Sequence, residues 1–510
     1  MDYKILNSFS TYFPKSNIIK IGYLEDYQRY GTMALTVSIS IFIICALLLE
    51  IILAFVIFCI FFLIITKVPQ IEYNKNQARI EAEFPFMLRT LGTLLNVNIS
   101  FKKAFQIISK SEGSLGDEMK TVNQEVDNGA SVPKALSNMA QRIRSNDIKT
   151  AISQMITAYD VGGKGNEIRR ISQEMAIKQR HNLKEYASIS SVFGLLFIVS
   201  STLLPTFFVV LSSLGGQILE TEITEMHAKL IIIIVIPLIS FIVLQLMKLN
   251  EPLQISERKK SGKEFILLMV PIAGFLFFQE IGFIILIFTF LVSGAIFYKL
   301  YRKETRIEMI EKNLPNALMA AATLPENSKL EDIFRIFKKG DYEELSKEAE
   351  ISLRQLESKI GDKKVLQDFS KRNDGHLIER TVQTIDYSLE SGNTKRINET
   401  AEDLLEFNGL VKERESLLSV QKYTLLFGVV ILPLILNSVI SILQKMSSIT
   451  KGNPEVLNSI NGVIPAYILI YAIFISYYIA EISKKRSTMF IYFNVLSIIG
   501  LVSFYFGKIL

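Results

Sequence analysis

The chain alternates between apolar runs and two long polar segments, and this alternation constrains its fold more than any other feature. One bilayer crossing needs about 20 apolar residues. Residues 33–67 and 265–300 are each far longer than that and are interrupted near the middle by a single acid, Glu50 and Glu280 respectively. We therefore predict that each run is a membrane hairpin of two helices that turns in water at its glutamate, rather than an ion or proton relay.

Shorter apolar runs predict further membrane helices, and they separate the polar segments. The expected elements are an N-terminal segment 1–32, a helix pair over 188–247, a basic loop over 248–264, a second pair over 422–481 and a last helix over 488–506. The count is nine membrane helices if both long runs are hairpins and seven if neither is. The two polar segments, 68–187 and 301–421, are the expected working domains.

Basic residues in the short loops predict the orientation. The loop 248–264 carries five Lys or Arg residues, whereas the loop 212–229 carries three glutamates and one lysine. Because Lys and Arg concentrate in cytoplasmic loops, we expect a multi-pass protein of the cell membrane. Its N-terminus and both polar segments would be cytoplasmic and its C-terminus outside.

The sequence also contains an internal duplication. Six features recur in order at offsets of 228 to 232 residues, namely Glu50 and Glu280, Pro85 and Pro315, Asn98 and Asn327, Gly129 and Gly361, Tyr159 and Tyr387, and Pro205 and Pro433. Each copy consists of a hairpin, a polar domain and a helix pair. Since each copy has four crossings, the two copies share one orientation, unlike the inverted repeats of many transporters.

Both polar segments are predicted to be all-α bundles of six helices. Apolar residues follow helical spacing from Phe84 to Leu95 and again from Ile148 to Tyr159, and long alternating patterns typical of strands are absent. The last helix of each bundle continues into a membrane helix with little loop signal. The segment 68–187 has a net charge of +4 and the segment 301–420 a net charge of −4, so we expect the copies to be specialised for different faces or partners.

No catalytic, metal or cofactor site is predicted. Cys45 and Cys59 lie in an apolar run, and the three histidines are far apart in the sequence. The sequence GGKG at 162–165 lacks the spacing of a phosphate-binding loop and favours a helix break. A net charge of +6 over 510 residues gives no argument for nucleic acid as a partner.

Several motifs resemble the F domain of type II secretion and type IV pilus platform proteins. They are the EFP sequence before the first bundle helix, NISFKKAF from Asn98, DNGASVPKAL from Asp127, and the glycine breaks GGKGNE and SLESGNT. The positions that carry this resemblance or the duplicated structure are Pro85, Gly129, Gly163, Gly165, Pro205, Pro315, Gly361, Glu390, Gly392 and Pro433. The usual early glycine is replaced by Asn98 and Asn327, and nine helices exceed the three usual in bacterial members. The chain is thus more similar to the platform proteins of archaella and archaeal adhesion pili.

The resemblance implies a non-enzymatic platform that acts as an oligomer, often a dimer. A hexameric secretion ATPase in the cytoplasm would dock on the helical domains, and pilin-like or archaellin-like subunits would be lifted from the bilayer into a filament. We expect Lys102, Lys103, Arg169 and Arg170 to contribute to the ATPase contact.

Two other functions compete with a platform. A secondary transporter built from parallel repeats would need polar residues that converge in the middle of the bilayer and helices that break there, for which Pro205 and Pro433 are the hints. A membrane-embedded prepilin-type peptidase would carry acids at membrane-helix ends, but the Gly-Asp pairs beginning at Gly340 and Gly361 lie in a polar segment.

Overall fold

The computed structural model defines most of the chain after residue 50. The described residues are 36, 38–40, 51–96, 99–109, 114–162, 165–218, 224–249, 263–277, 282–325, 328–373, 375–391, 395–450, 454–483 and 485–507. Every regular element among these residues is a helix. The predicted all-α fold is therefore confirmed.

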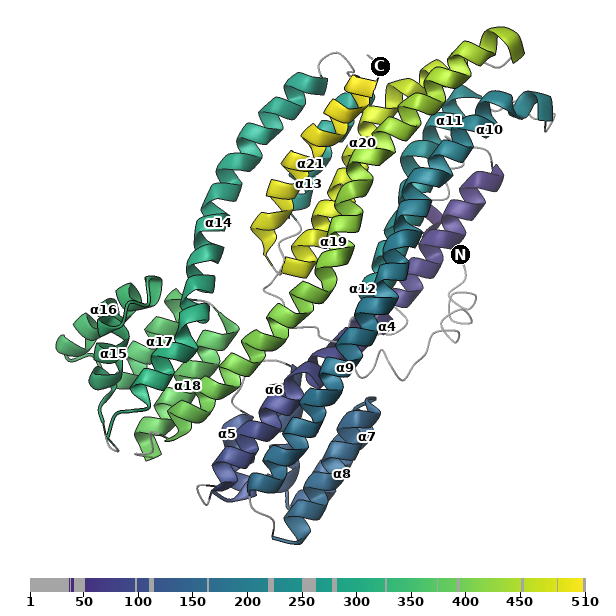
Figure 1. Cartoon of the computed structure of the whole chain (residues 1–510). Coiled ribbons are helices and arrows are strands. Elements are labelled where there is room, and N and C mark those ends of the chain that lie inside the picture. The colour runs from purple at the N-terminus through teal and green to yellow at the C-terminus, as the bar shows by residue number, and fades with distance from the viewer. Residues whose placement is uncertain are drawn as a thin grey trace.

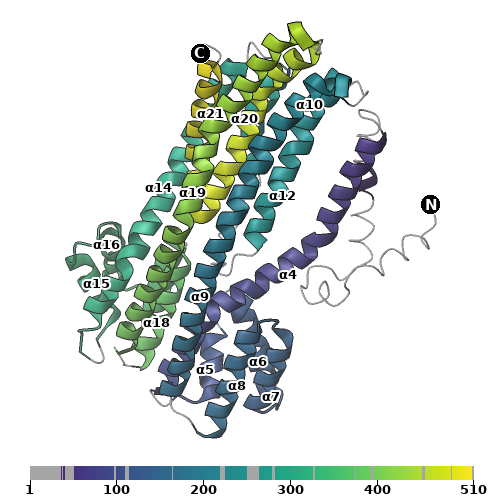
Figure 2. The same ribbon diagram turned by 45° about the vertical axis from the view of Figure 1, so that its right-hand side comes forward.

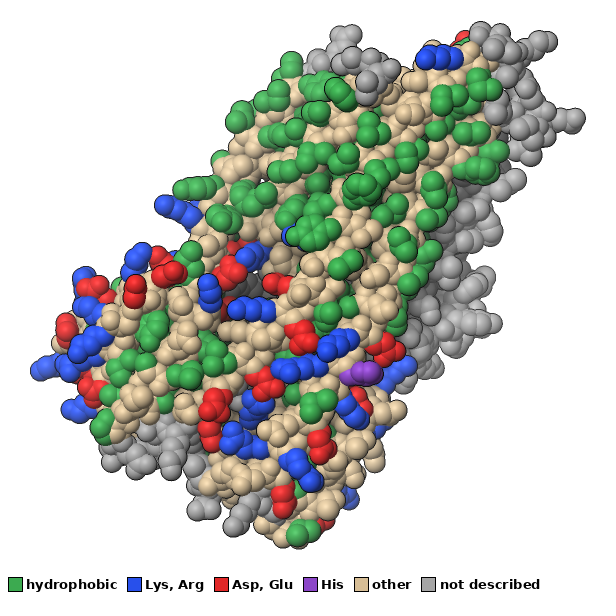
Figure 3. All heavy atoms as spheres, in the orientation of Figure 1, with side chains coloured by type: hydrophobic (Ala, Val, Ile, Leu, Met, Phe, Trp, Pro, Cys, Tyr) green, Lys and Arg blue, Asp and Glu red, His purple; other side chains and the backbone are tan. Residues whose placement is uncertain are grey.

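Two polar helical bundles lie side by side at one end of the molecule, and long apolar helices extend from both of them (Figure 1). Apolar side chains cover the visible surface of the long helices, while Lys, Arg, Asp and Glu gather over the bundles (Figure 3). This division matches the alternation in the sequence. It places one end of the molecule in water and the other in lipid.

Six helices form the first bundle. They are α4 (Ile51–Asn96), α5 (Phe101–Ile108), α6 (Ser114–Asp127), α7 (Val132–Arg142), α8 (Asn146–Asp160) and α9 (Gly165–Ile198). Their apolar faces meet in one core that includes Phe84, Leu88, Met119, Leu136 and Ile152. The side chain of Ser100 caps α5 by accepting a hydrogen bond from the Lys103 amide, as expected for an N-cap serine.

The second bundle has the same number of helices. They are α14 (Gly282–Ala321), α15 (Leu330–Lys339), α16 (Glu344–Glu357), α17 (Asp362–Arg372), α18 (His376–Ser391) and α19 (Lys395–Thr450). Leu314, Phe334, Phe337, Ala349 and Phe369 are buried at its centre. Both bundles thus have a separate hydrophobic core.

The last helix of each bundle continues into the membrane region (Figure 2). Helix α9 passes through a π-helical turn, η1 (Val199–Leu203), into α10 (Leu204–Ile218). Helix α19 is a single helix of 56 residues. The predicted continuity between bundle and membrane helix is therefore observed in both halves.

The remaining helices belong to the membrane region. They are α11 (Glu225–Leu230), η2 (Ile231–Val235), α12 (Ile236–Leu249), α13 (Lys263–Phe277), α20 (Pro454–Ser483) and α21 (Arg486–Gly507). The described residues contain six candidate membrane spans, and α20 is the most buried of them. It packs against α19 and α21 at the centre of the apolar core.

Helices α13 and α14 pack against each other where the second hairpin is predicted. The rings of Phe275 and Phe283 meet edge to face with centroids 5.2 Å apart, and a Cβ at Gly274 would lie 3.0 Å from the Ile285 side chain. The two helices thus run alongside each other on either side of the predicted turn. Glu280, and Glu50 of the first predicted hairpin, lie outside the described residues.

One pair in the predicted duplication is wrong. Gly129 follows α6 with φ of +96°, a left-handed conformation that glycine adopts without steric cost. Gly361 has φ of −62° and is the N-cap of α17. The left-handed residue of the second copy is Lys359, with φ of 60°, so the turn after α16 uses a lysine where the first copy has glycine.

Candidate functional site

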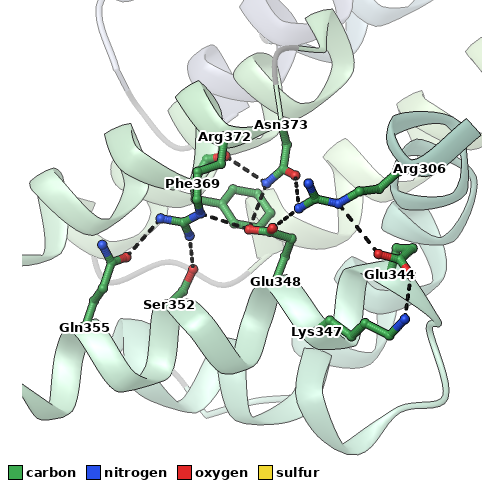
Figure 4. Close-up of polar contacts among 9 residues, drawn as sticks. All are labelled: Arg306, Glu344, Lys347, Glu348, Ser352, Gln355, Phe369, Arg372 and Asn373. Atoms are coloured by element: carbon green, nitrogen blue, oxygen red, sulfur yellow. Dashed lines mark hydrogen bonds and ion pairs between the residues drawn. The ribbon is translucent and has the colours of Figure 1, made fainter. Parts of the chain in front are cut away.

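A network of charged side chains joins three helices of the second bundle (Figure 4). Glu348 on α16 has only 2% of its side chain exposed. Arg372 of α17 donates to its Oε2 from Nε at 3.0 Å, Arg306 of α14 donates to its Oε1, and Asn373 donates to Oε2 at 3.2 Å. Because a buried carboxylate needs donors to replace its lost water, this network fixes the arrangement of α14, α16 and α17.

The first bundle contains the corresponding ion pair 230 residues earlier. Arg142 of α7 donates from Nε to Glu118 of α6 at 2.9 Å and from Nη1 to Glu125 at 2.6 Å. In the second bundle, Arg372 also donates from Nη1 to Gln355, at 3.2 Å. Burial lowers the pKa of Arg142, but hydrogen bonds and charge from the two glutamates outweigh it and raise that pKa above its ordinary value. This recurrence supports the internal duplication and was missed in the sequence, although the offset of 230 could have revealed it.

Three of the four predicted basic contact residues are exposed near the membrane-distal end of the first bundle. Lys102 and Lys103 lie in the first turn of α5, and Lys102 pairs with Asp127 at 3.0 Å. Arg170 lies in the first turns of α9 and pairs with Glu174 at 3.7 Å. Arg169 differs, because it pairs with Glu399 of α19 at 3.3 Å and joins the two bundles.

A close crossing of two glycines fixes the start of α9. A Cβ at Gly165 would collide with the backbone carbonyl of Gly92 on α4, and a Cβ at Gly92 would lie 2.7 Å from the Gly165 carbonyl oxygen. The Asn96 amide nitrogen donates to the Asn166 side-chain oxygen at 2.9 Å beside this crossing. Gly165 is therefore required by close packing, whereas the sequence predicted only a helix break. Gly92 was missed, although a glycine within an apolar helical stripe is a signal for close packing.

Polar side chains also gather where the two long helices enter the membrane region. Gln421 of α19 accepts from the Ser190 hydroxyl at 2.7 Å and the Tyr478 hydroxyl at 2.6 Å, and its amide donates to the Ser190 carbonyl at 2.9 Å. All three side chains are buried. The cluster links α9, α19 and α20. It was missed in the sequence, where the available signal was a glutamine near the start of an apolar run.

Pro205 lies just after the π-helical turn η1 of the first membrane helix. Proline has no N–H to donate to the Ser201 carbonyl one turn earlier. The hydroxyl of Tyr467 on α20 donates to that carbonyl at 2.5 Å. The carbonyl that Pro205 leaves without a backbone donor is thus satisfied by a side chain of α20, as expected for proline in a membrane helix.

The other motif residues lie inside helices or outside the described part of the chain. The Pro85 carbonyl in α4 accepts from the buried Ser172 hydroxyl at 2.7 Å. Pro315 and Pro433 lie within α14 and α19. Glu390 is in the last turn of α18, and Gly163 and Gly392 lie outside the described residues.

Metal-ligating side chains do not cluster in the described ranges. No group of three or more His, Cys, Asp or Glu residues there has the proximity needed to hold a metal ion.

Comparison with known protein families identifies the domain in the first half of the chain. Residues 87–212 match the family described as Type II secretion system (T2SS), protein F. The matched region covers most of the first bundle, η1 and the first half of α10. No curated protein and no solved structure matches the chain.

The fold and this match define the class of the molecule: an all-α, polytopic membrane protein that carries a T2SS protein F domain. The resemblance to platform proteins of type II secretion and type IV pili is thereby confirmed.

Proposed function

We propose that this chain is a non-enzymatic membrane platform that couples a cytoplasmic secretion ATPase to the assembly of pilin-like or archaellin-like subunits into a filament. The observation that carries the proposal is the helical continuity from each bundle into the membrane region, through α9, η1 and α10 in one half and α19 in the other. A helix without a flexible joint transmits a displacement along its axis. Movement of a bundle would therefore reach the apolar helices.

The ATPase would contact the membrane-distal end of the first bundle. Lys102, Lys103 and Arg170 are exposed there, and positive charge at this end would attract an acidic partner surface and speed its association. The guanidinium of Arg169 is engaged with Glu399. Lys102 and Arg170 also form ion pairs, but more than half of each of their side chains is exposed, whereas Arg169 is 31% exposed. We therefore assign the contact to the other three basic residues.

The position of the bundles in the cell is part of the same proposal. Both bundles and the N-terminus would face the cytoplasm and the C-terminus would be outside, in accord with the basic loop over 248–264. The filament would be an archaellum or an archaeal adhesion pilus, because the number of apolar helices exceeds that of the bacterial platform proteins. Subunits would be lifted from the bilayer at the apolar surface that Figure 3 shows.

Binding of the secretion ATPase from the same cell tests this proposal. The full chain in lipid nanodiscs would be immobilised, and ATPase binding would be compared with that of Lys102→Glu/Lys103→Glu. The matched control is Lys338→Glu/Lys339→Glu, which reverses two neighbouring lysines at the end of α15 in the second bundle. We expect the first variant to weaken binding about tenfold at low salt and the control to leave it unchanged. Failure of the parent chain to bind the ATPase would contradict the proposal.

A further inference from the structure

Helix α14 carries an exposed stripe that changes from apolar to basic where the helix approaches the second bundle. Only 17% of its most apolar stretch is buried, the smallest share among the six candidate membrane spans of the described residues. Exposed side chains follow one another along one face of α14 at intervals of three or four residues. They are Ile284, Phe288, Leu291, Ala295, Lys299 and Arg302. The basic end of the stripe therefore continues the surface that faces lipid.

Two exposed tyrosines, Tyr298 and Tyr301, mark the level at which the stripe leaves the hydrocarbon. Tyrosine concentrates at the membrane–water interface, because its ring is apolar and its hydroxyl is polar. The guanidinium carbon of Arg302 lies 5.3 Å from the centroid of the Tyr298 ring. Lys299, Arg302 and Lys303 all lie within about 8 Å of Tyr298 along the helix axis. These three residues, which we call the basic turn, thus lie at the depth of the lipid phosphates.

The basic turn has no acidic partner in the part of the chain that the structure describes. All three of its side chains are exposed, and none forms an ion pair there. The nearest acids of α14 are engaged on another side of the helix. Glu304 accepts a hydrogen bond from the Ser487 amide at 3.0 Å, and Glu308 pairs with Lys485 at 2.7 Å. Three positive charges are therefore left uncompensated at the edge of the apolar surface.

We propose that the basic turn binds the headgroup of an anionic phospholipid in the leaflet next to the bundles. The ammonium and guanidinium groups donate hydrogen bonds to the phosphate oxygens, and the acyl chains lie along the exposed stripe from Ala295 towards Ile284. A zwitterionic headgroup also carries a cation, which the basic turn repels, so charge selects the anionic class. This inference does not rest on the proposed ATPase coupling.

The shape of the surface favours a lipid over an acidic soluble partner. Lys299 continues directly from Ala295 and Leu291 on the same face. A ligand that covers this face must be anionic at one end and apolar along the rest. A phospholipid has that form, whereas an acidic soluble protein would leave the apolar part of the stripe uncovered.

Tryptophan fluorescence in the full chain tests which lipid lies beside the stripe. The chain contains no tryptophan, so Leu291→Trp introduces a single reporter at a position that is 70% exposed. The variant would be reconstituted into vesicles of phosphatidylcholine and phosphatidylglycerol in which one or the other lipid carries brominated acyl chains, which quench tryptophan on contact. We expect phosphatidylglycerol to be enriched at least about fivefold beside the reporter, since one basic residue near an anionic surface already gives that factor. Equal quenching by the two brominated lipids would overturn the proposal.

A second reporter distinguishes a local site from a general attraction of anionic lipid to the chain. Phe207 of α10 is 65% exposed, and Phe207→Trp reports the lipid on a different membrane helix. We expect phosphatidylglycerol to be enriched less than about twofold there. Equal enrichment at the two reporters would contradict a site on α14.

Neutralising the basic turn tests whether its charges hold the lipid. In the Leu291→Trp background, Lys299→Gln, Arg302→Gln and Lys303→Gln together should reduce the enrichment to less than about twofold. Lys299→Arg, Arg302→Lys and Lys303→Arg together keep the charge and should retain the enrichment. Enrichment that survives neutralisation would overturn the assignment to these residues.

The matched control removes the same charges elsewhere. Lys103→Gln, Lys134→Gln and Arg170→Gln together replace two lysines and one arginine that are exposed on the first bundle. We expect this variant to keep the enrichment of phosphatidylglycerol beside Leu291→Trp. A loss equal to that of the neutralised basic turn would show that only the net charge of the chain matters and would contradict the proposal.

Discussion

Replacing the two corresponding arginines of the bundles by alanine tests whether burial of the partner carboxylate sets the strength of each network. Arg142 and Arg372 are similarly exposed, with 30% and 28% of their side chains accessible. Their partners differ, because Glu118 is 24% exposed and Glu348 only 2% exposed. The two variants therefore compare a partly exposed and a buried carboxylate partner, and Arg142 has in addition a second carboxylate partner, Glu125, where Arg372 has Gln355.

The expected magnitudes follow from this difference. Removing one partner of a buried ion pair lowers the free energy of unfolding by about 3–5 kcal/mol. We expect Arg372→Ala to lower it by about 3 kcal/mol, because Arg306 and Asn373 still donate to Glu348. Partly exposed pairs contribute about 1 kcal/mol or less, which we expect for Arg142→Ala. The second bundle should thus open about a hundredfold more often in its variant, and the first bundle about fivefold more often.

Native-state proteolysis of the full chain in detergent measures these populations, since cleavage follows the open fraction when reclosing is fast. Mass spectrometry of the fragments assigns each cut to a bundle. Arg354→Ala is the control, because this arginine is exposed and pairs with Glu350 of its own helix; it should change cleavage by less than about twofold. Equal effects of Arg142→Ala and Arg372→Ala would refute the reasoning from burial.

Three further predictions concern other positions. Gly165→Ala should destabilise the first bundle by several kcal/mol in thermal unfolding, because the added Cβ would meet backbone atoms. Gly361→Ala should be nearly neutral, because a Cβ at Gly361 would meet no atom within 4 Å. Equal effects of the two variants would exclude the close crossing of Gly92 and Gly165. Tyr467→Phe should lower the melting temperature by a few degrees, since the Ser201 carbonyl loses its donor, and an unchanged melting temperature would count against that hydrogen bond. Burial raises the pKa of Glu81 above its ordinary value of 4.5 despite a hydrogen bond from Ser145. The stability that protonated Glu81 contributes is fully present below pH 4.5 and is lost as pH rises through the raised pKa of the folded protein. Glu81→Gln should therefore exceed the parent in stability at pH 7 and match it near pH 4 in denaturant titrations, and a constant difference would argue against titration of Glu81.

Local features of the fold were predictable because their causes are local in the sequence. Helical spacing from Phe84 to Leu95 predicted a buried stripe, and the structure buries Phe84, Leu88 and Leu91 completely. The turn at Gly129 followed from the conformational freedom of glycine. The corresponding turn of the second bundle was not predictable, because Lys359 adopts the left-handed conformation there and a lysine does not indicate such a turn in a sequence.

The contacts between distant segments were not predictable in this way. Arg169 was assigned to an exposed face, but Glu399 lies 230 residues away and its proximity depends on how α9 and α19 pack. Burial of Glu348 likewise depends on three helices that meet only in the folded bundle. Sequence spacing therefore identified the helices, while the networks between them required the three-dimensional arrangement.

Filament assembly in a strain that lacks the gene tests the platform function most directly. Surface filaments of each type would be counted by negative-stain electron microscopy, and membrane fractions would be probed for the corresponding subunits. A platform protein predicts that one class of filament disappears while its subunits remain unassembled in the membrane, and that the wild-type gene restores the filaments. Normal numbers of every filament class in the deletion strain would contradict the proposed function.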